Sequence, residues 1–256
     1  MNIKKHIPNI ITLGNLLCGT IATIYAVRGD FYTTAILVGI GIVFDFFDGF
    51  VARLLQVQGE FGKQLDSLAD MVTSGVVPGI VMVQFMLSST LYNQLGVSSW
   101  DAALDMGLNI DNWFSYEVLG LLLTLFAGYR LAKFNIDERQ SDSFIGLPTP
   151  AMNLFVLSLP LISEYTTNIL IQDIIHNKYV LIVITILLSV LMVSEVKLFS
   201  LKFKNYAFNK NIFKYTFLLL SIALLITLKF VAIPVIILLY ILLSVFKNLK
   251  KEAVKN

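Results

Sequence analysis

Residues 45–70 read DFFDGFVARLLQVQGEFGKQLDSLAD, and four aspartates in this stretch stand out against an apolar chain. Asp45 and Asp48 are three positions apart, and Asp66 and Asp70 are four apart. Residues with these spacings share one face of a helix. A short connection containing two glycines separates the pairs and returns the chain as an antiparallel neighbour. The sequence therefore predicts that the four carboxylates converge in one small volume.

The composition of the chain is that of an integral membrane protein. Its 256 residues are 57% hydrophobic and 14% charged, whereas soluble domains are less apolar and carry more charge. Several apolar runs approach or exceed the roughly 18 to 20 residues that cross a bilayer as a helix. Helices are expected because lipid offers no partner to an unpaired backbone group, and the runs do not alternate as barrel strands do. Cys18 is the only cysteine, so an internal disulfide is excluded.

Apolar runs place eight candidate membrane spans along the chain. They cover roughly residues 8–27, 32–54, 66–88, 116–134, 149–165, 179–197, 214–230 and 232–247. A tight connection near Lys229 and Pro234 separates the last two, so the count is seven or eight. The first run is long for a signal peptide and contains polar residues, so we interpret it as a retained span. The expected fold is an all-α integral membrane protein, a helical bundle of about eight transmembrane helices in a single domain, 1–256.

The distribution of Lys and Arg predicts the orientation in the membrane. If the N-terminus is cytoplasmic and the sides alternate, the outer basic residues are Arg28, Lys178 and Lys229. The inner ones are Lys4, Lys5, Arg53, Lys63, Arg130, Lys133, Arg139, Lys197, Lys202, Lys204, Lys210, Lys214, Lys247, Lys250, Lys251 and Lys255. The long outer segment 88–115 is expected to be a loop or a surface-lying helix. Both termini and the aspartate stretch are therefore predicted to face the cytoplasm.

Four aspartates near a membrane need neutralising cations. One Asp at the centre of a span costs about 2.5 to 3.5 kcal/mol, less near the interface, and four like charges also repel one another. Carboxylate oxygens suit Mg²⁺, Mn²⁺ or Ca²⁺, and the stretch lacks the Cys or His that zinc favours. Two metals held close together would clamp both oxygens of a phosphoryl displacement.

Small and basic residues accompany the carboxylates. Gly49 and Ala52 would let a flat or bulky group approach the backbone, and the guanidinium of Arg53 suits phosphate oxygens. The alternative is that these are interfacial acids with small residues for helix packing. That alternative explains any single residue but not the whole spaced set.

The pattern D-x2-D-G-x2-A-R-x8-G-x3-D-x3-D resembles the signature of the CDP-alcohol phosphotransferase family, and every fixed position matches. The resemblance implies a six-helix catalytic core, which we place at 1–197 with two additional C-terminal helices at 198–256. It also implies two divalent metal ions, a CDP-linked donor and a homodimer. By analogy the metal ligands are Asp45, Asp48, Asp66 and Asp70, of which Asp70 is alternatively the base that deprotonates the acceptor hydroxyl. The residues that would meet the CDP moiety are Gly49, Ala52, Arg53 and Gly62.

Other segments bear on the acceptor alcohol. The first span reads PNIITLGNLLCG from Pro8, the fourth ends YRLAKFN from Tyr129, and FIGLPTPA follows from Phe144. These segments are similar to those of the bacterial and archaeal phosphatidylserine synthases of the family, which implies L-serine as acceptor and CDP-diacylglycerol as donor in a bacterial or archaeal cell membrane. The polar residues Asn9, Thr12 and Asn15 have roughly helical spacing and are candidates for the donor site, although helix packing is the alternative.

The acceptor site is assigned to two basic residues. Arg130 can hold a carboxylate bidentately, with Lys133 beside it; alternatively, both are anchors whose long side chains reach the interface. A phosphorylated acceptor, glycerol phosphate or inositol phosphate, would need a more basic pocket. An ion-coupled transporter would carry its carboxylates near the midplane, often with an inverted repeat. The sequence leaves direct displacement and a covalent intermediate open, though no dedicated nucleophile stands out. No nucleic-acid partner is expected.

Overall fold

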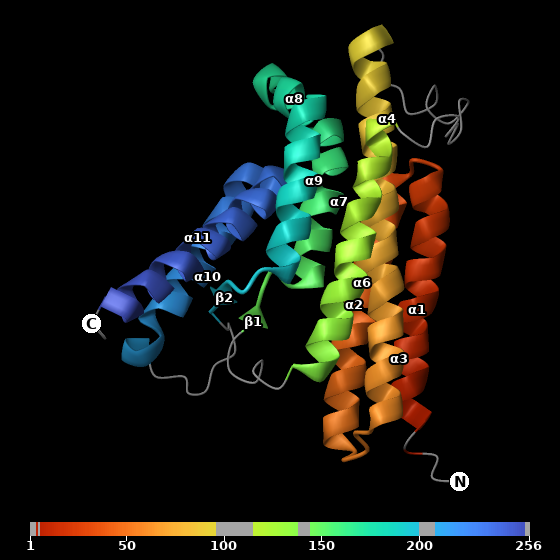
Figure 1. Ribbon diagram of the computed structural model, residues 1–256, viewed down its shortest axis with the longest axis vertical. Coiled ribbons are helices and arrows are strands. Elements are labelled where there is room, and N and C mark those ends of the chain that lie inside the picture. The colour runs from red at the N-terminus through yellow and green to blue at the C-terminus, as the bar shows by residue number, and fades with distance from the viewer. Residues whose placement is uncertain (1–3, 5, 96–114, 138–143, 200–207, 254–256) are drawn as a thin grey trace.

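The computed structural model of the chain describes residues 4, 6–95, 115–137, 144–199 and 208–253, most of which are helical (Figure 1). The α-helices are α1 (His6–Val27), α2 (Phe31–Leu54), α3 (Glu60–Met71), α4 (Val77–Leu95), α6 (Leu122–Ile136), α7 (Thr149–Tyr165), α8 (Ile169–Ile175), α9 (Lys178–Val193), α10 (Phe208–Leu228) and α11 (Ala232–Ala253). The π-helical turn η2 (Val72–Val76) joins α3 to α4. Two 3-10 turns, η3 (Tyr116–Leu121) and η5 (Lys229–Val231), precede α6 and α11.

The helices form an upright bundle of antiparallel neighbours. In Figure 1, α1 starts at the lower end, α2 returns to it, and α3 starts there again. The turn between α1 and α2 is tight: Gly29 has a positive φ of 73°, and Asp30 caps α2 by accepting a hydrogen bond from the Thr33 N–H at 2.9 Å. The α2–α3 turn also uses a left-handed residue, Gln56, with φ 54°. The aspartates of α2 and α3 therefore lie at one end of the bundle.

Five helical stretches of the described chain are long and apolar enough to cross a membrane, and the bent pair α8–α9, with 61° between its helices, makes a sixth if it is one span. The chain is an integral membrane protein with a helical bundle, as predicted. Each of the eight expected spans coincides with a helix. Length and hydropathy give fewer spans than the eight expected for two reasons. Helix α7 has only 17 residues, and Asn211–Phe246, which contains two expected spans, passes as one stretch of 36 residues.

The last of these stretches is a hairpin. Lys229 has a positive φ of 51°, which breaks the helix between α10 and α11. The rings of Phe217 and Tyr240 then lie with centroids 5.9 Å apart across the two helices. Figure 1 shows α10 and α11 side by side. The two expected spans around Lys229 are therefore separate, antiparallel helices.

The helix that carries Asp66 and Asp70 is the central one. In Glu60–Thr90, 67% of the most apolar window is buried within the protein, against 28% or less in the other four candidate spans. Large side chains of α4, among them Met82, Phe85 and Met86, are fully buried. The central position leaves this helix surrounded by protein rather than lipid, which suits acidic side chains at its start.

A short β ladder is the exception to the expected all-helical fold. β1 (Phe144–Ile145) pairs antiparallel with β2 (Lys197–Leu198). The ladder ties the start of α7 to the end of α9. The expected outer loop lies mostly outside the described residues, as do the predicted inner residues Lys5, Arg139, Lys202, Lys204 and Lys255.

Candidate active site

The structure brings the four aspartates of α2 and α3 together. One carboxylate oxygen from each of Asp45, Asp48 and Asp66 lies within 4.8 Å of the other two. The charge of Asp70 acts on all three of these carboxylates. The i, i+3 and i, i+4 spacings place each pair on one helix face, and the antiparallel turn sets the two faces against each other. Such an arrangement of anionic oxygens fits a divalent cation.

Thr12 on α1 also contacts this cluster of aspartates. Its hydroxyl donates a hydrogen bond to Asp48 Oδ2 at 2.5 Å, and its oxygen also lies 3.1 Å from the Pro8 carbonyl. Asp48 is only 6% exposed. Asp66 Oδ1 is buried and has no hydrogen-bond partner among the described residues. A buried anionic oxygen that receives no hydrogen bond is suited to ligate a cation, so the carboxylates fit a divalent metal ion.

Asn15 lies one helical turn along α1 from Thr12 and contacts the fourth aspartate. Its Nδ2 donates to Asp70 Oδ1 at 3.3 Å. Its Oδ1 accepts from the Thr73 hydroxyl at 2.9 Å. Thr12 and Asn15 thus face the carboxylates rather than lipid, and both are buried.

The small residues predicted to meet the CDP moiety line the same end of the bundle. A Cβ built on Gly62 would lie 3.5 Å from Asn9 Oδ1, so the first turns of α1 and α3 face each other there. Within the described part of the chain, a Cβ on Gly49 would meet only the Arg53 guanidinium, at 3.6 and 4.0 Å. Ala52 is half-buried, and Arg53 is exposed. The backbone at Gly49 is therefore open apart from the guanidinium that folds back over it.

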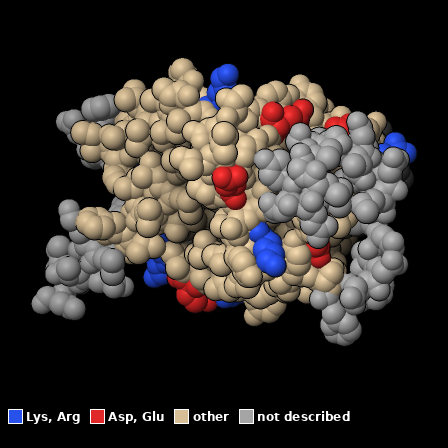
Figure 2. All heavy atoms as spheres, turned by 90° about the horizontal axis from the view of Figure 1, so that it is seen from above, with Lys and Arg blue, Asp and Glu red and all other residues tan. Residues whose placement is uncertain are grey.

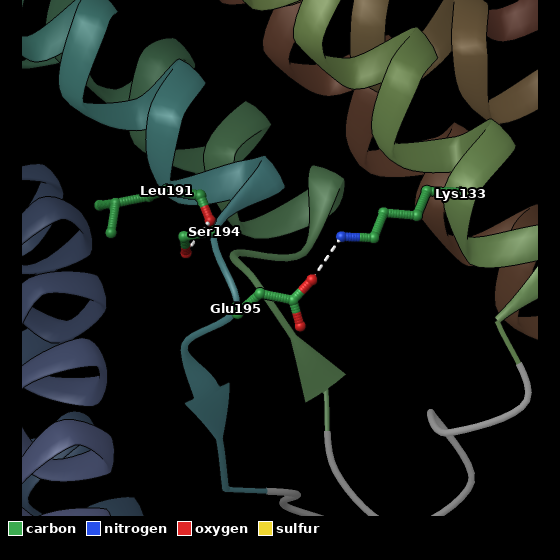
Figure 3. Close-up of polar contacts among 4 residues, drawn as sticks. All are labelled: Lys133, Leu191, Ser194 and Glu195. Carbon is green, nitrogen blue, oxygen red and sulfur yellow. Dashed lines mark hydrogen bonds and ion pairs between the residues drawn. The ribbon is translucent and has the colours of Figure 1, made fainter.

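The two basic residues assigned to the acceptor occupy different surroundings. Arg130 on α6 is only 7% exposed, and its charge acts on Asp70. Its Nε is buried without a hydrogen-bond partner in the described part of the chain. Lys133 instead forms an ion pair with Glu195 between α9 and β2, with Nζ 2.7 Å from Oε1 (Figure 3). Arg130 therefore faces the aspartates, whereas Lys133 is held by another element.

The sequence of the chain has known relatives with this motif. Residues 5–191 match the family model of the CDP-alcohol phosphatidyltransferases. The chain belongs to the CDP-alcohol phosphatidyltransferase family. The matched residues include all four aspartates and end before α10 and α11. Because the members of this family are transferases, we discard the hypothesis that the chain is an ion-coupled transporter.

Similar members of the family come from bacteria and archaea. The CDP-diacylglycerol–serine O-phosphatidyltransferase of Bacillus subtilis is 30% identical over 195 residues, which are 75% of this chain and 89% of that protein. The protein of the same name from Helicobacter pylori strain 26695 is 27% identical over 226 residues, 84% of this chain and 80% of that protein. The archaetidylserine synthase of Methanothermobacter thermautotrophicus is 28% identical over 206 residues, 77% and 73% of the two chains.

Two buried polar residues beside the family motif escaped the sequence interpretation. Thr73 lies in η2, three residues after Asp70, and Asn153 lies in α7. Asn153 Nδ2 donates to the Thr73 carbonyl at 3.0 Å. A π-helical turn leaves no periodicity signal in a sequence. Asn153, however, is an amide within a long apolar run, and an amide in a membrane helix needs a partner.

Proposed function

We propose that this family member transfers the phosphatidyl group of CDP-diacylglycerol to the hydroxyl of L-serine, giving phosphatidylserine and CMP. The observation that carries the proposal is the set of carboxylates within 4.8 Å of one another, Asp45, Asp48 and Asp66, with Asp70 and the buried Arg130 beside them. The names of the similar proteins from B. subtilis and H. pylori support serine as the acceptor.

The metal requirement follows from the donor atoms. Asp45, Asp48 and Asp66 would hold two divalent ions, Mg²⁺ or Mn²⁺, with Asp70 as either a fourth ligand or the base. When bound, such ions supply charge neutralisation for the diphosphate of the donor and for the departing CMP. The buried and unpartnered Asp66 Oδ1 supports this assignment.

The donor is held by residues from α1, α2 and α3. Arg53 contributes a guanidinium for a phosphate oxygen. The open backbone beside Gly49, and the small residues Ala52 and Gly62, leave room for the cytidine part. Asn9, Thr12 and Asn15 line the same space from α1. We assign these seven residues to the CDP-lipid.

We assign the binding and the deprotonation of the acceptor to Arg130 and Asp70. Arg130 binds the serine carboxylate through its guanidinium, and Asp70 accepts the hydroxyl proton as the serine oxygen attacks the phosphorus that carries diacylglycerol. A new O–P bond to serine forms, and the P–O bond to CMP breaks. Lys133 adds positive charge at the edge of this site, although its ion pair with Glu195 gives it a structural partner.

The site is proposed to face the cytoplasm of a bacterial or archaeal cell, with both termini on that side, and the protein to work as a homodimer. The excess of Lys and Arg at the aspartate end of the bundle supports this orientation. At the opposite end, seen in Figure 2, the Lys and Arg side chains in view are scattered and form no continuous patch.

The acceptor assignment is tested by measuring CMP release from CDP-diacylglycerol with different alcohols. The purified protein should release CMP with L-serine, and glycerol 3-phosphate and inositol phosphate should support much slower release. A faster reaction with glycerol 3-phosphate would show that the protein belongs to another branch of the family.

A further inference from the structure

A chain of hydrogen bonds from α7 to α3 ends on Asp70. Asn153 Nδ2 donates to the Thr73 carbonyl at 3.0 Å and lies 3.4 Å from Ser74 Oγ. The Thr73 hydroxyl donates to Asn15 Oδ1 at 2.9 Å, and Asn15 Nδ2 donates to Asp70 Oδ1 at 3.3 Å. Asn153, Thr73 and Asn15 are each 1% exposed or less. The links from Asn153 to Asn15 therefore lie inside the protein, where water does not compete for them, and the final bond to Asp70 is part-buried.

The Thr73 hydroxyl, which also lies 3.2 Å from the Asn15 main-chain carbonyl, favours one orientation of the Asn15 amide toward Asp70. An amide offers a carbonyl oxygen on one side and an NH₂ group on the other, and only the NH₂ side can donate to a carboxylate. A hydroxyl that donates to Oδ1 holds the amide with its NH₂ group toward Asp70. Without that hydroxyl, the amide could turn and set its oxygen against the carboxylate.

The π-helical turn η2 supplies the Thr73 carbonyl that Asn153 contacts and places the Thr73 hydroxyl beside Asn15. In η2 the N–H of Val77 bonds to the Val72 carbonyl, five residues back, and the wider turn frees neighbouring carbonyls for other donors. The side-chain amide of Asn153 donates a hydrogen bond to the Thr73 carbonyl. The backbones of α1 and η2 approach so closely that a Cβ on Gly19 would lie 2.9 Å from Thr73 Cα. Gly41 on α2 faces the same pair, since its Cβ would lie 2.9 Å from Asn15 Oδ1.

We propose that Thr73 and Asn153 are positioning residues that fix the orientation of the Asn15 amide, and through it the carboxylate of Asp70, for the transfer reaction. This inference rests on the proposed function insofar as Asp70 takes part in the reaction. Thr73 and Asn153 touch neither substrate. They act on the turnover step, whereas the cluster of Asp45, Asp48 and Asp66 that would bind the donor remains intact without them.

The test is a comparison of two substitutions at one position. Thr73→Val keeps the shape and removes the hydroxyl, whereas Thr73→Ser keeps the hydroxyl. Thr73→Val should lower kcat about ten-fold or more, the range expected when a buried acceptor loses its donor. Thr73→Ser should stay within about three-fold of the wild type. Binding of CDP-diacylglycerol in Mn²⁺, measured without serine, should weaken less than kcat falls in Thr73→Val, because Asn15 is only one of the seven residues assigned to the donor, and it should change little in Thr73→Ser.

Two further variants separate positioning from a general packing effect. Asn153→Leu, which removes the donor to the Thr73 carbonyl, should lower kcat in the same direction as Thr73→Val. Thr185→Val is the matched control, because Thr185 is equally buried but, among the described residues, its hydroxyl bonds only to the Leu181 carbonyl of its own helix α9, at 2.8 Å. It should leave kcat and donor binding unchanged.

A double-mutant cycle tests whether Thr73 acts through Asn15. In an Asn15→Ala background, adding Thr73→Val should change kcat by less than about two-fold, because no amide remains to be oriented. An equal loss in both backgrounds, or equal losses for Thr73→Val and Thr73→Ser, would overturn the proposal. The serine–valine comparison stands even where Asn15→Ala is nearly inactive. A wild type that releases no CMP with serine would instead contradict the acceptor assignment, and the same variants would then be compared on the alcohol that the wild type uses.

Discussion

Asp70 differs from the other three aspartates in what surrounds it. It accepts a hydrogen bond from Asn15 and feels the charge of Arg130. Asp45, Asp48 and Asp66 lie close to one another, and Asp48 also accepts a hydrogen bond from Thr12. Arg130 is a buried cation whose charge acts on Asp70. Asp70 is therefore suited to take a proton from an acceptor that Arg130 holds.

We therefore expect different defects from Asp70→Asn and Asp45→Asn. Asp70→Asn should leave metal-dependent binding of CDP-diacylglycerol largely intact and lower turnover by at least about a hundred-fold, within the usual range for general-base catalysis. Asp45→Asn should weaken donor binding as well as turnover, since it removes a metal ligand. Donor affinity in Mn²⁺ distinguishes the two. If Asp70→Asn loses donor binding as badly as Asp45→Asn, Asp70 is chiefly a ligand and the base lies elsewhere.

Arg130 and Lys133 should also differ. Arg130→Ala should raise the KM for serine about ten- to a hundred-fold, as expected for a lost charge-assisted hydrogen bond, and should change the KM for CDP-diacylglycerol far less. Lys133→Ala is the natural comparison, because its ammonium is paired with Glu195 and partly exposed. It should change the serine KM by only a few-fold. Equal serine dependence in wild type and Arg130→Ala would return Arg130 to the role of an interfacial anchor.

At the scale of single residues, the clustering of the four aspartates could be predicted, whereas most of the residues that form hydrogen bonds around them could not. The spacing of Asp45, Asp48, Asp66 and Asp70 follows helical geometry, which is local in sequence. The partners of these acids come from α1 and α7, far along the chain, and no spacing rule reaches them. Thr12 and Asn15 were found only because polar residues are conspicuous in an apolar span, while Thr73 depends on a π turn that leaves no pattern.

The contact between α1 and η2 is the tightest packing around the site. Gly19 allows the two backbones to meet, because a Cβ there would lie 2.9 Å from Thr73 Cα and 3.0 Å from its nitrogen. A backbone cannot move aside as a flexible side chain does. The close approach of α1 and η2, which brings Asn15 and Thr73 together, thus requires a residue without a Cβ at position 19.

Gly19→Ala should destabilise the protein, and Gly39→Ala should not. An added methyl group at a packed position costs about 1 to 3 kcal/mol. Gly39 on α2 has nothing within 4 Å of the position of its Cβ, and alanine there even favours the helix. Thermal unfolding in detergent should show a lower Tm for Gly19→Ala alone, together with lower turnover. Equal Tm values for the two variants would mean that α1 and η2 do not pack this closely.

The positions of the helices were predicted better than their lengths. Hydropathy located the third span at 66–88, whereas the continuous helical stretch begins at Glu60 and extends to Leu95. Its first turns in α3 are polar, so an apolar window cannot detect them. The break between α10 and α11 was found because Lys229 interrupts two apolar runs. The β1–β2 ladder was missed because two-residue strands have too short a pattern to read.

The whole molecule places the start of α1 and the α2–α3 turn at one end, the end at which α2 and α3 carry the aspartates. The sequence predicted that the aspartates meet at one end from their helical spacing and the short α2–α3 connection, because consecutive helices in a bundle run in opposite directions. The division into a core at 1–197 and two added helices stays a prediction, although the family match ends at residue 191.

Cysteine labelling tests the orientation. The native Cys18 is buried, so it should react slowly with a membrane-impermeant maleimide. Gln58→Cys lies in the exposed α2–α3 turn and Lys178→Cys at the exposed start of α9. Only Lys178→Cys should be labelled in intact cells, and both should be labelled after the membrane is permeabilised. The reverse pattern would place the aspartates outside the cell.

The central claim is that carboxylates holding divalent metal drive phosphatidyl transfer to serine. The most direct measurement follows labelled serine into lipid by the purified protein with CDP-diacylglycerol, in Mn²⁺ or Mg²⁺ and in excess chelator. Labelled phosphatidylserine and an equal amount of CMP should appear with metal, vanish in chelator and return when metal is restored. Full turnover in excess chelator, or CMP release without labelled lipid, would contradict the account.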